Sequence, residues 1–192
     1  MQLDRIELNI NSELECRAVS KGLIIIFTGE GKGKTTAALG MALRAWGHEK
    51  KVLVIQFIKT KRFVTGESLA AERLGERFTI KTMGEGFVSG GVDLDRHRIG
   101  AQRALDSARE ALSNPAIDVV VLDEITWALK YGLISEKQVL DLIALKPPAT
   151  HLVLTGRDAL PSLIEAADVV TEMKCVKHHY QRGVGAQKGV EY

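Results

Sequence analysis

Short, continuous runs of apolar residues alternate along the chain with longer stretches in which apolar and polar residues mix at helical spacing. The run at residues 119–122 is Val-Val-Val-Leu, which is typical of a strand whose two faces are both covered by helices. The runs predict strands over residues 23–28, 51–58, 78–83, 119–123, 151–155 and 169–176. The mixed stretches predict helices over residues 34–46, 66–74, 94–112, 136–145 and 159–166.

This alternation predicts the fold class, an α/β protein built on a single doubly wound, mostly parallel sheet. The predicted elements occupy residues 22–176, which we interpret as one domain. The flanking residues fit the pattern poorly. We predict an N-terminal arm over residues 1–21 and a C-terminal arm over residues 177–192, the latter packed on the same domain. A free tail is the alternative for each arm.

Local signals support several helix boundaries. Gly47 follows the first predicted helix, where a left-handed C-cap is expected. Ser135 and Gln138 have the spacing of a capping box that opens the fourth predicted helix. Pro147 and Pro148 exclude its continuation.

The turn between the first predicted strand and the first predicted helix is rich in glycine and leads into Lys-Thr-Thr. This context is typical of a phosphate-binding loop (P-loop), in which backbone N–H groups and a helix N-terminus surround phosphate oxygens. We expect Lys34 to reach the outer phosphates and the Thr35 hydroxyl to ligate Mg²⁺. The predicted polyphosphate-binding residues are Gly29, Glu30, Gly31, Lys32, Gly33, Lys34, Thr35 and Thr36.

The loop departs from the common G-x-x-x-x-G-K-[ST] spacing, because Thr28 stands where the first glycine is expected. Counted from Gly29, it is one residue short. A shorter loop is still expected to hold a polyphosphate, with another phosphate at its centre as one consequence. The alternative is a glycine-rich turn with a chance lysine, which the flanking strand and helix disfavour.

The fourth predicted strand ends in an acidic pair, Asp123 and Glu124. An apolar strand that ends in carboxylates is the Walker-B arrangement, which completes a metal site beside the P-loop. Together with the P-loop it predicts a site formed by Thr35, Asp123 and Glu124 for Mg²⁺, with Mn²⁺ as an alternative ion. A solvated strand end is the competing interpretation, and the spacing leaves open which carboxylate binds directly. After the fifth strand, Arg157 is either a phosphate contact or a partner of a nearby acid such as Asp158.

The composition of the 192 residues is ordinary for a globular protein, with 45% hydrophobic and 26% charged residues. The formal net charge of +2 gives no indication of a nucleic-acid or membrane partner. The basic run from Lys59 to Arg62 is interpreted either as a solvated loop or as a phosphate contact.

The two cysteines are too few for a disulfide framework, and neither a signal peptide nor a membrane span is predicted. We therefore predict a cytoplasmic protein. Cys175 and His178 resemble half of a zinc site, but no second pair accompanies them.

Several segments together resemble the ATP:corrinoid adenosyltransferases of the cytosolic P-loop type. The resemblance covers about residues 22–192 in the right order, which is far more specific than a P-loop alone. It rests on the shortened loop and on five further segments: Gln56-Phe57-Ile58-Lys59, Gly86-Phe87, Val121-Leu122-Asp123-Glu124-Ile125-Thr126, Thr155-Gly156-Arg157 and the tail from Val176 to Tyr192.

The resemblance implies a P-loop NTPase (RecA-like) architecture and transfer of the 5′-deoxyadenosyl group of ATP to Co(I) of a reduced corrinoid, with release of triphosphate. It implies ATP as co-substrate, and Lys34 and Glu124 as the residues that stabilise the leaving group. In the family the short loop cradles the γ-phosphate. Arg44 matches a family arginine that contacts the nucleotide. The resemblance also implies a homodimer and a flavoprotein as candidate reductant.

One departure from the family concerns the corrinoid. Phe87 matches an aromatic residue that lines the family's corrinoid pocket, but Ser89 stands where the family has tryptophan. The N-terminal arm, which caps the partner subunit's site in relatives, is short and unmatched here. The resemblance therefore extends further over the ATP-binding segments than over the corrinoid-binding ones.

Two competing functions follow from the P-loop alone. The first is a RecA-like ATPase or kinase that releases ADP, in which Glu124 activates water. The second is a nucleotide-gated binding module without enzymatic activity. The phosphate product formed in the presence of reduced corrinoid distinguishes the three.

Overall fold

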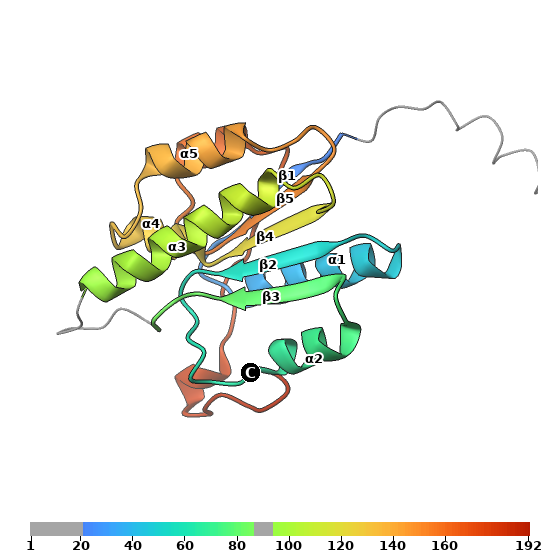
Figure 1. Ribbon diagram of the computed structural model, residues 1–192. Coiled ribbons are helices and arrows are strands. Elements are labelled where there is room, and N and C mark those ends of the chain that lie inside the picture. Colours follow the sequence, from blue (N-terminus) through green and yellow to red (C-terminus); the bar gives the residue numbers. More distant parts are fainter. Residues whose placement is uncertain (1–20, 87–93) are drawn as a thin grey trace, which may run out of the picture.

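The computed structural model describes residues 21–86 and 94–192. Its centre is a six-stranded sheet with the order β3-β2-β4-β5-β1-β6, in which every neighbouring pair is parallel (Figure 1). The strands are β1 (Ile24–Thr28), β2 (Val52–Gln56), β3 (Phe78–Thr82), β4 (Val119–Asp123), β5 (His151–Thr155) and β6 (Val169–Glu172). The predicted α/β class with a single sheet is confirmed.

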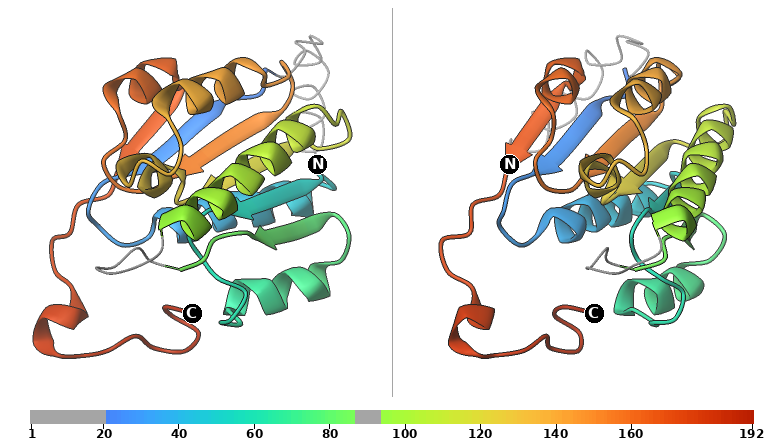
Figure 2. Two further views of the ribbon diagram at one scale, coloured as in Figure 1. Left: turned by 60° about the vertical axis from the view of Figure 1, so that its left-hand side comes forward. Right: turned by 90° about the vertical axis from the view of Figure 1, so that its left-hand side faces the viewer.

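Helices cover both faces of the sheet, as Figure 2 shows from two further directions. They are α1 (Lys34–Gly47), α2 (Gly66–Leu74), α3 (Leu94–Leu112), α4 (Ile125–Lys130), α5 (Glu136–Ala144) and α6 (Pro161–Ala166). The four helices α3 to α6 pack on one face and α1 and α2 on the other. The doubly wound arrangement is therefore confirmed.

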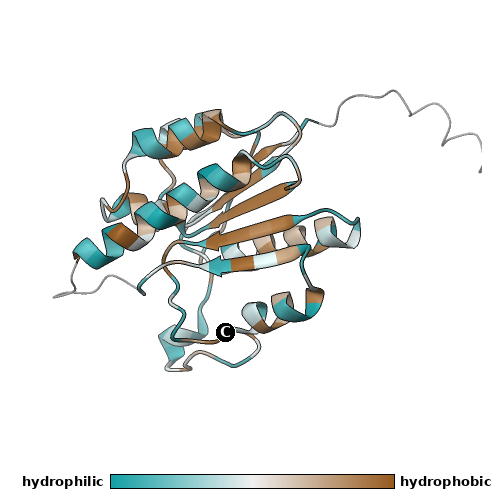
Figure 3. Ribbon diagram, viewed as in Figure 1, coloured by the Kyte–Doolittle hydropathy of each residue, from teal (hydrophilic) through white to brown (hydrophobic). Residues whose placement is uncertain are grey.

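The strand sequences explain this arrangement, because successive side chains of a strand point to opposite faces. In β4, Val120 and Leu122 belong to the core beneath α3 and α5, whereas Val119 and Val121 belong to the core beneath α1. Both sets are buried, so the strand has to be apolar throughout. Figure 3 shows the central strands in nearly continuous brown, while α3 and α5 also carry hydrophilic residues.

Parallel strands bring their carboxyl ends to one edge of the sheet, where α/β proteins bind ligands. The order β2-β4-β5-β1 places the ends of four strands side by side. Gln56 lies in register with Asp123, and Phe27 with Thr155. The P-loop, the acidic pair and Arg157 all follow these strands, so the fold gathers them at one edge.

Some boundaries differ from the prediction. The expected left-handed cap at Gly47 is wrong, because α1 includes Gly47 and the left-handed residue is Glu49, with φ 61°. The helix α4 was not predicted, since its six residues are too short to show a helical period. The sixth helix begins at Pro161, whose fixed φ suits the first turn of a helix, rather than at residue 159.

Other boundaries agree with the expected chemistry. The capping box at the start of α5 is confirmed: the Gln138 N–H donates to Ser135 Oγ at 3.2 Å, and the Ser135 N–H donates to Gln138 Oε1 at 2.8 Å. The helix ends at Ala144, shortly before the two prolines. Within the described ranges, no helix combines the length and apolar character needed to cross a bilayer.

The segment after β6 leaves the sheet, passes the P-loop and forms a short 3₁₀ helix at His179–Arg182. The Gly31 N–H donates to the Met173 carbonyl at 2.6 Å, and Lys32 forms an ion pair with Glu191. Residue 192 lies beside α2, as both Figure 1 and Figure 2 show. The division into a domain and two arms stays a prediction, and residues 1–20 lie outside the described residues.

The packing of α3 on the sheet provides a test of the fold. Leu105 is fully buried between α3 and the strands, so Leu105→Ala is expected to lower the free energy of unfolding by about 2–5 kcal/mol. Leu43→Ala is the matched control, because the Leu43 side chain is half exposed on α1. Urea unfolding followed by circular dichroism measures both. Equal losses for the two variants would contradict the described packing.

Candidate functional site

A cleft of about 690 Å³ opens at the carboxyl edge of the sheet. Seven consecutive residues of the predicted loop, Glu30 to Thr36, line one side of it. Side chains that follow β2, β4 and β5 or lie on α2 and α4 line much of the remainder, and the segment after β6 forms a further wall. These side chains include Lys59, Glu67, Glu124, Trp127, Arg157, Cys175, His178, Tyr180, Val190, Glu191 and Tyr192.

The P-loop owes its shape to two glycines and to the segment after β6. Gly29 and Gly33 have φ values of 95° and 111°, which side chains with a β-carbon rarely adopt. A β-carbon on Gly29 would also lie 2.5 Å from the Met173 carbonyl oxygen. Helix α1 begins at Lys34, directly after Gly33. The first backbone N–H groups of a helix have no acceptor within the helix, so those of α1 are available to a ligand at the loop.

Lys34 is nearly buried within the loop. Its Nζ donates to the carbonyl oxygens of Gly29 and Gly31, both at 2.7 Å. Burial lowers the pKa of the Lys34 ammonium, although the carboxylate of Glu124 opposes this shift. The ammonium therefore rests on neutral carbonyl oxygens at the cleft wall, where an anionic oxygen would bind it more strongly.

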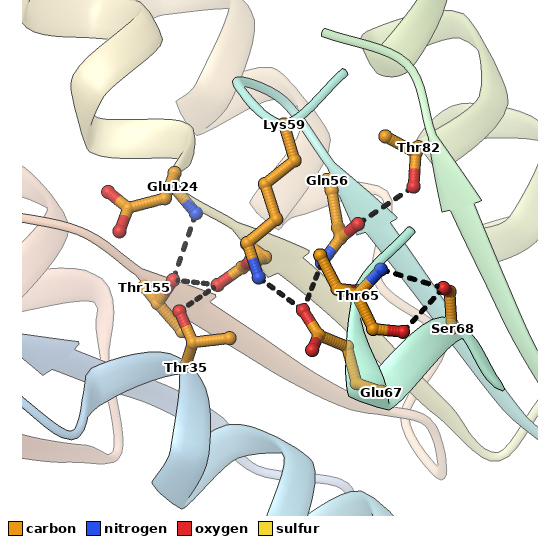
Figure 4. A network of polar contacts seen from close by, with 10 residues as sticks. Thr35, Gln56, Lys59, Thr65, Glu67, Ser68, Thr82, Glu124 and Thr155 are labelled. Carbon is orange, nitrogen blue, oxygen red and sulfur yellow. Dashed lines mark hydrogen bonds and ion pairs between the residues drawn. The ribbon is translucent and has the colours of Figure 1, made fainter. Parts of the chain in front are cut away.

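The acidic pair at the end of β4 lies directly beside the start of α1 (Figure 4). Asp123 is 1% exposed, and its Oδ1 accepts from the Thr35 hydroxyl at 2.7 Å and from the Thr155 hydroxyl at 2.8 Å. The Glu124 N–H donates to Thr155 Oγ1 at 2.9 Å. Because the Thr35 proton points to Asp123, the lone pairs of the Thr35 oxygen remain available for a cation.

Glu124 has a left-handed backbone, with φ 61°, at the start of α4. Burial, together with the charge of Asp123, raises the pKa of the Glu124 carboxyl to about 7. One oxygen of each carboxylate, Asp123 Oδ2 and Glu124 Oε2, is buried without a hydrogen bond. Two buried carboxylate oxygens without donors form an environment that a bound cation would satisfy.

These residues fit Mg²⁺. Thr35, Asp123 and Glu124 offer hard oxygen donors, and Mg²⁺ keeps several water ligands while it binds one or two carboxylates. In the part of the chain that the structure describes, no group of three or more His, Cys, Asp or Glu side chains has the arrangement of a metal site. A site completed by water and phosphate oxygens does not need such a group.

Arg157 pairs with an acid of the P-loop. Its Nη1 lies 2.7 Å from Glu30 Oε2, whereas Asp158 pairs with Lys130 at 2.7 Å. The Arg157 guanidinium carbon also lies 5.9 Å from the centre of the Trp127 ring. Of the two alternatives weighed for Arg157, the structure contains an ion pair, at a position that lines the cleft.

Two predicted contacts, Arg44 and Phe87, are not among the described residues that line the cleft. Arg44 is exposed in the last turn of α1, ten residues beyond Lys34 and thus about 15 Å further along the helix axis. Phe87 and Ser89 lie outside the described residues. The roles assigned to Arg44 and Phe87 stay predictions.

Several cleft residues were missed by the sequence analysis. Trp127 lies on the helix that was not predicted, so no periodicity pointed to it. Glu67 was assigned only to a helix, although it sits in the first turn of α2 at the cleft. The segment after β6 was expected to pack on the domain, but nothing in its pattern indicated that it lines the site.

Comparison with known proteins agrees with this geometry. A family model described as ATP:corrinoid adenosyltransferase BtuR/CobO/CobP matches residues 20–192. A corrinoid adenosyltransferase of Pseudomonas aeruginosa is 40% identical over 191 residues, covering 100% of this chain and 94% of the relative. One from Sinorhizobium sp. is 42% identical, covering 90% of this chain and 81% of the relative. The corrinoid adenosyltransferase CobA of Salmonella typhimurium is 35% identical, with coverages of 98% and 93%.

A more distant likeness concerns the fold alone. The crystal structure of the flagellar accessory protein FlaH from Methanocaldococcus jannaschii superposes with a TM-score of 0.54 at 16% sequence identity. The match covers 79% of this chain and 71% of FlaH. On the family model and on the near full-length relatives together, this chain belongs to the ATP:corrinoid adenosyltransferase family.

Proposed function

We propose that the cleft binds the triphosphate of ATP while the 5′-deoxyadenosyl group is transferred to Co(I) of a corrinoid substrate. The cobalt electron pair forms the bond to C5′, the C5′–O bond breaks, and its electrons leave with triphosphate. The observation that carries the assignment of the site is the position of Lys34, Thr35 and Glu124 on one cleft, with the buried Asp123 carboxylate hydrogen-bonded to Thr35. The ATPase and kinase alternatives lose their support, because the relatives are adenosyltransferases.

The chain's own residues stabilise the leaving group in this proposal. Triphosphate gains negative charge as the C5′–O bond breaks, and fixed donors aimed at that charge lower the barrier. Lys34 exchanges the Gly29 and Gly31 carbonyl oxygens for phosphate oxygens, and the loop N–H groups surround the same phosphate. Mg²⁺, or Mn²⁺ in its place, held by Thr35, Glu124 and Asp123, would neutralise further charge on the triphosphate.

The proposal needs no general base, because Co(I) already carries the attacking electron pair. What the protein has to supply is alignment of C5′ with cobalt and exclusion of water. Glu124 is therefore assigned to charge stabilisation, not to activation of water. Its Oε2 is buried without a hydrogen-bond donor, and Glu124 lines the same cleft as Thr35, which supports this assignment.

Finer parts of the function also remain proposals. We assign Arg44 as a nucleotide contact and Phe87 as a corrinoid contact, because both match family positions. A homodimer, a cytoplasmic location and a flavoprotein reductant are proposed on the same basis. The position of Arg44, far from the cleft of its own chain, is compatible with a contact that involves another subunit.

Lys34→Ala tests the leaving-group role. Loss of a preorganised charge contact is expected to weaken ATP binding and to reduce turnover by on the order of 10²-fold or more. Lys61→Ala, an exposed lysine outside the cleft, serves as control and is expected to retain wild-type turnover. Steady-state kinetics with chemically reduced corrinoid measures both variants. Near wild-type activity of Lys34→Ala would remove the P-loop from the mechanism.

The products separate transfer from hydrolysis. With MgATP and reduced corrinoid, adenosylated corrinoid and triphosphate are expected in equal amounts. Without corrinoid, little ADP is expected, since no residue is assigned to activate water. Anion-exchange chromatography of the phosphates measures both. Steady ADP formation that is independent of corrinoid and is abolished in Glu124→Gln would favour an ATPase instead.

The environment of Glu124 predicts a pH-dependent stability of the metal-free, nucleotide-free protein. Because the pKa of Glu124 rises from 4.5 to about 7 on folding, the folded state binds this proton more tightly than the unfolded state. The stabilising contribution of the protonated group is fully present below about pH 4.5 and is lost as the pH rises through about 7.

Glu124→Gln removes this titration. The difference in melting temperature, variant minus wild type, is therefore expected to increase by a few degrees when the pH is raised from 5 to 8. Both proteins are measured in EDTA. Glu72→Gln, on the exposed face of α2, is the control and is expected to show no such trend. A pH-independent difference for Glu124→Gln would mean that the carboxyl is not held in an unfavourable environment.

A further inference from the structure

Lys59 occupies a position in the cleft that the proposed function has not used. It follows β2, whose last residue Gln56 lies in register with Asp123. From the sequence, the basic run at Lys59 is interpreted either as a solvated loop or as a phosphate contact. The structure separates its members: Lys59 lines the cleft, whereas Lys61 and Arg62 are exposed and do not.

The Lys59 ammonium has one close partner and one distant one. It forms an ion pair with Glu67 Oε1, and it lies 4.0 Å from Asp123 Oδ2. The second distance is too long for a hydrogen bond. An ammonium has three donors, and the side chain is 30% exposed, so donor capacity remains on the side of the cleft.

Glu67 is itself held in place by its surroundings, as Figure 4 shows. It sits in the first turn of α2, which opens with a capping box between Thr65 and Ser68. Its Oε1 also lies 3.5 Å from Gln56 Nε2, and Gln56 Oε1 accepts from the Thr82 hydroxyl at 2.8 Å. The network therefore runs from the end of β3 through β2 and α2 to Lys59.

The far end of this network meets the proposed metal and phosphate site. Lys59 and Thr35 approach opposite oxygens of one carboxylate, Asp123 Oδ2 and Oδ1. The Asp123 carboxylate thus joins the Lys59 side of the cleft to the first turn of α1. Lys34 and Lys59 line one cleft from two different parts of the chain.

Of the residues that the structure describes, four lysine and arginine side chains line the cleft, and each contacts an acceptor of the protein itself. Lys34 rests on the loop carbonyl oxygens, Lys32 pairs with Glu191, Arg157 pairs with Glu30, and Lys59 pairs with Glu67. In the absence of ligand, the cations around a polyphosphate site are expected to pair with acceptors of the protein. Phosphate oxygens then replace these acceptors when the ligand binds. In this respect Lys59 resembles the residues already assigned to the phosphates.

We propose that Lys59 is a substrate-binding residue that contacts the triphosphate of ATP, at a phosphate group other than the one held by Lys34. This inference rests on the proposed triphosphate site. Glu67 is a positioning residue: its carboxylate holds the Lys59 ammonium at the cleft and gives it up to a phosphate oxygen. Glu67 and the phosphate therefore compete for one cation.

The competition predicts opposite effects of two substitutions, measured by calorimetric titration with inorganic tripolyphosphate in EDTA. Lys59→Met is expected to weaken the Kd by about tenfold or more, because a charge-assisted contact is lost. Glu67→Gln keeps the size of the side chain and a hydrogen-bond acceptor but removes the competing charge. It is expected to bind tripolyphosphate at least as tightly as wild type.

Matched controls separate a specific role of the Lys59 charge from a general effect of removing a lysine. Lys61→Met makes the same change two residues away, outside the cleft, and is expected to bind tripolyphosphate like wild type. Lys59→Arg keeps the positive charge and is expected to retain most of the wild-type affinity. Wild-type affinity of Lys59→Met, or equal weakening by Lys59→Met and Glu67→Gln, would overturn the inference and make the pair structural. Undiminished binding by Lys34→Ala would instead contradict the proposed triphosphate site itself.

Discussion

The carboxylate of Asp123 is the interaction on which the remainder of the site depends. It is almost completely buried, and a buried charge is stable only when donors or cations surround it. Two threonine hydroxyls, from α1 and β5, satisfy one oxygen, and the nearest cation, Lys59 after β2, faces the other. One side chain at the end of β4 thereby fixes the relative positions of three further elements.

This arrangement explains why the strand order matters for the chemistry. Because β4 lies between β2 and β5, its carboxyl end is within side-chain reach of both neighbours. The P-loop follows β1, one strand further on, and it leads into the first turn of α1, where Thr35 donates to Asp123. The polar network is therefore built at the one edge where all its members end, while the interior of the sheet stays apolar.

The sequence predicted the elements whose cause is local. Continuous apolar runs indicated buried parallel strands, and the glycine-rich turn before Lys34 indicated a phosphate loop, because both patterns reflect a backbone requirement. Helix α4 was not predicted, since six residues show no period. Glu67 and Trp127 were missed as cleft residues for a different reason. Their importance comes from side-chain partners, Lys59 for Glu67 and Arg157 for Trp127, which only the folded chain brings together, and no strand or helix pattern carries that information.

The contact between the P-loop and the segment after β6 has a consequence for the order in which the protein is made. The Gly31 N–H donates to the Met173 carbonyl oxygen, and a β-carbon on Gly29 would clash with the same carbonyl. The phosphate loop is synthesised early, yet the backbone that shapes it is translated more than 140 residues later. At a synthesis rate of roughly 5–20 residues per second, the loop waits for on the order of ten seconds without its support. During that interval the nascent chain carries the motif of a nucleotide site but not its folded form.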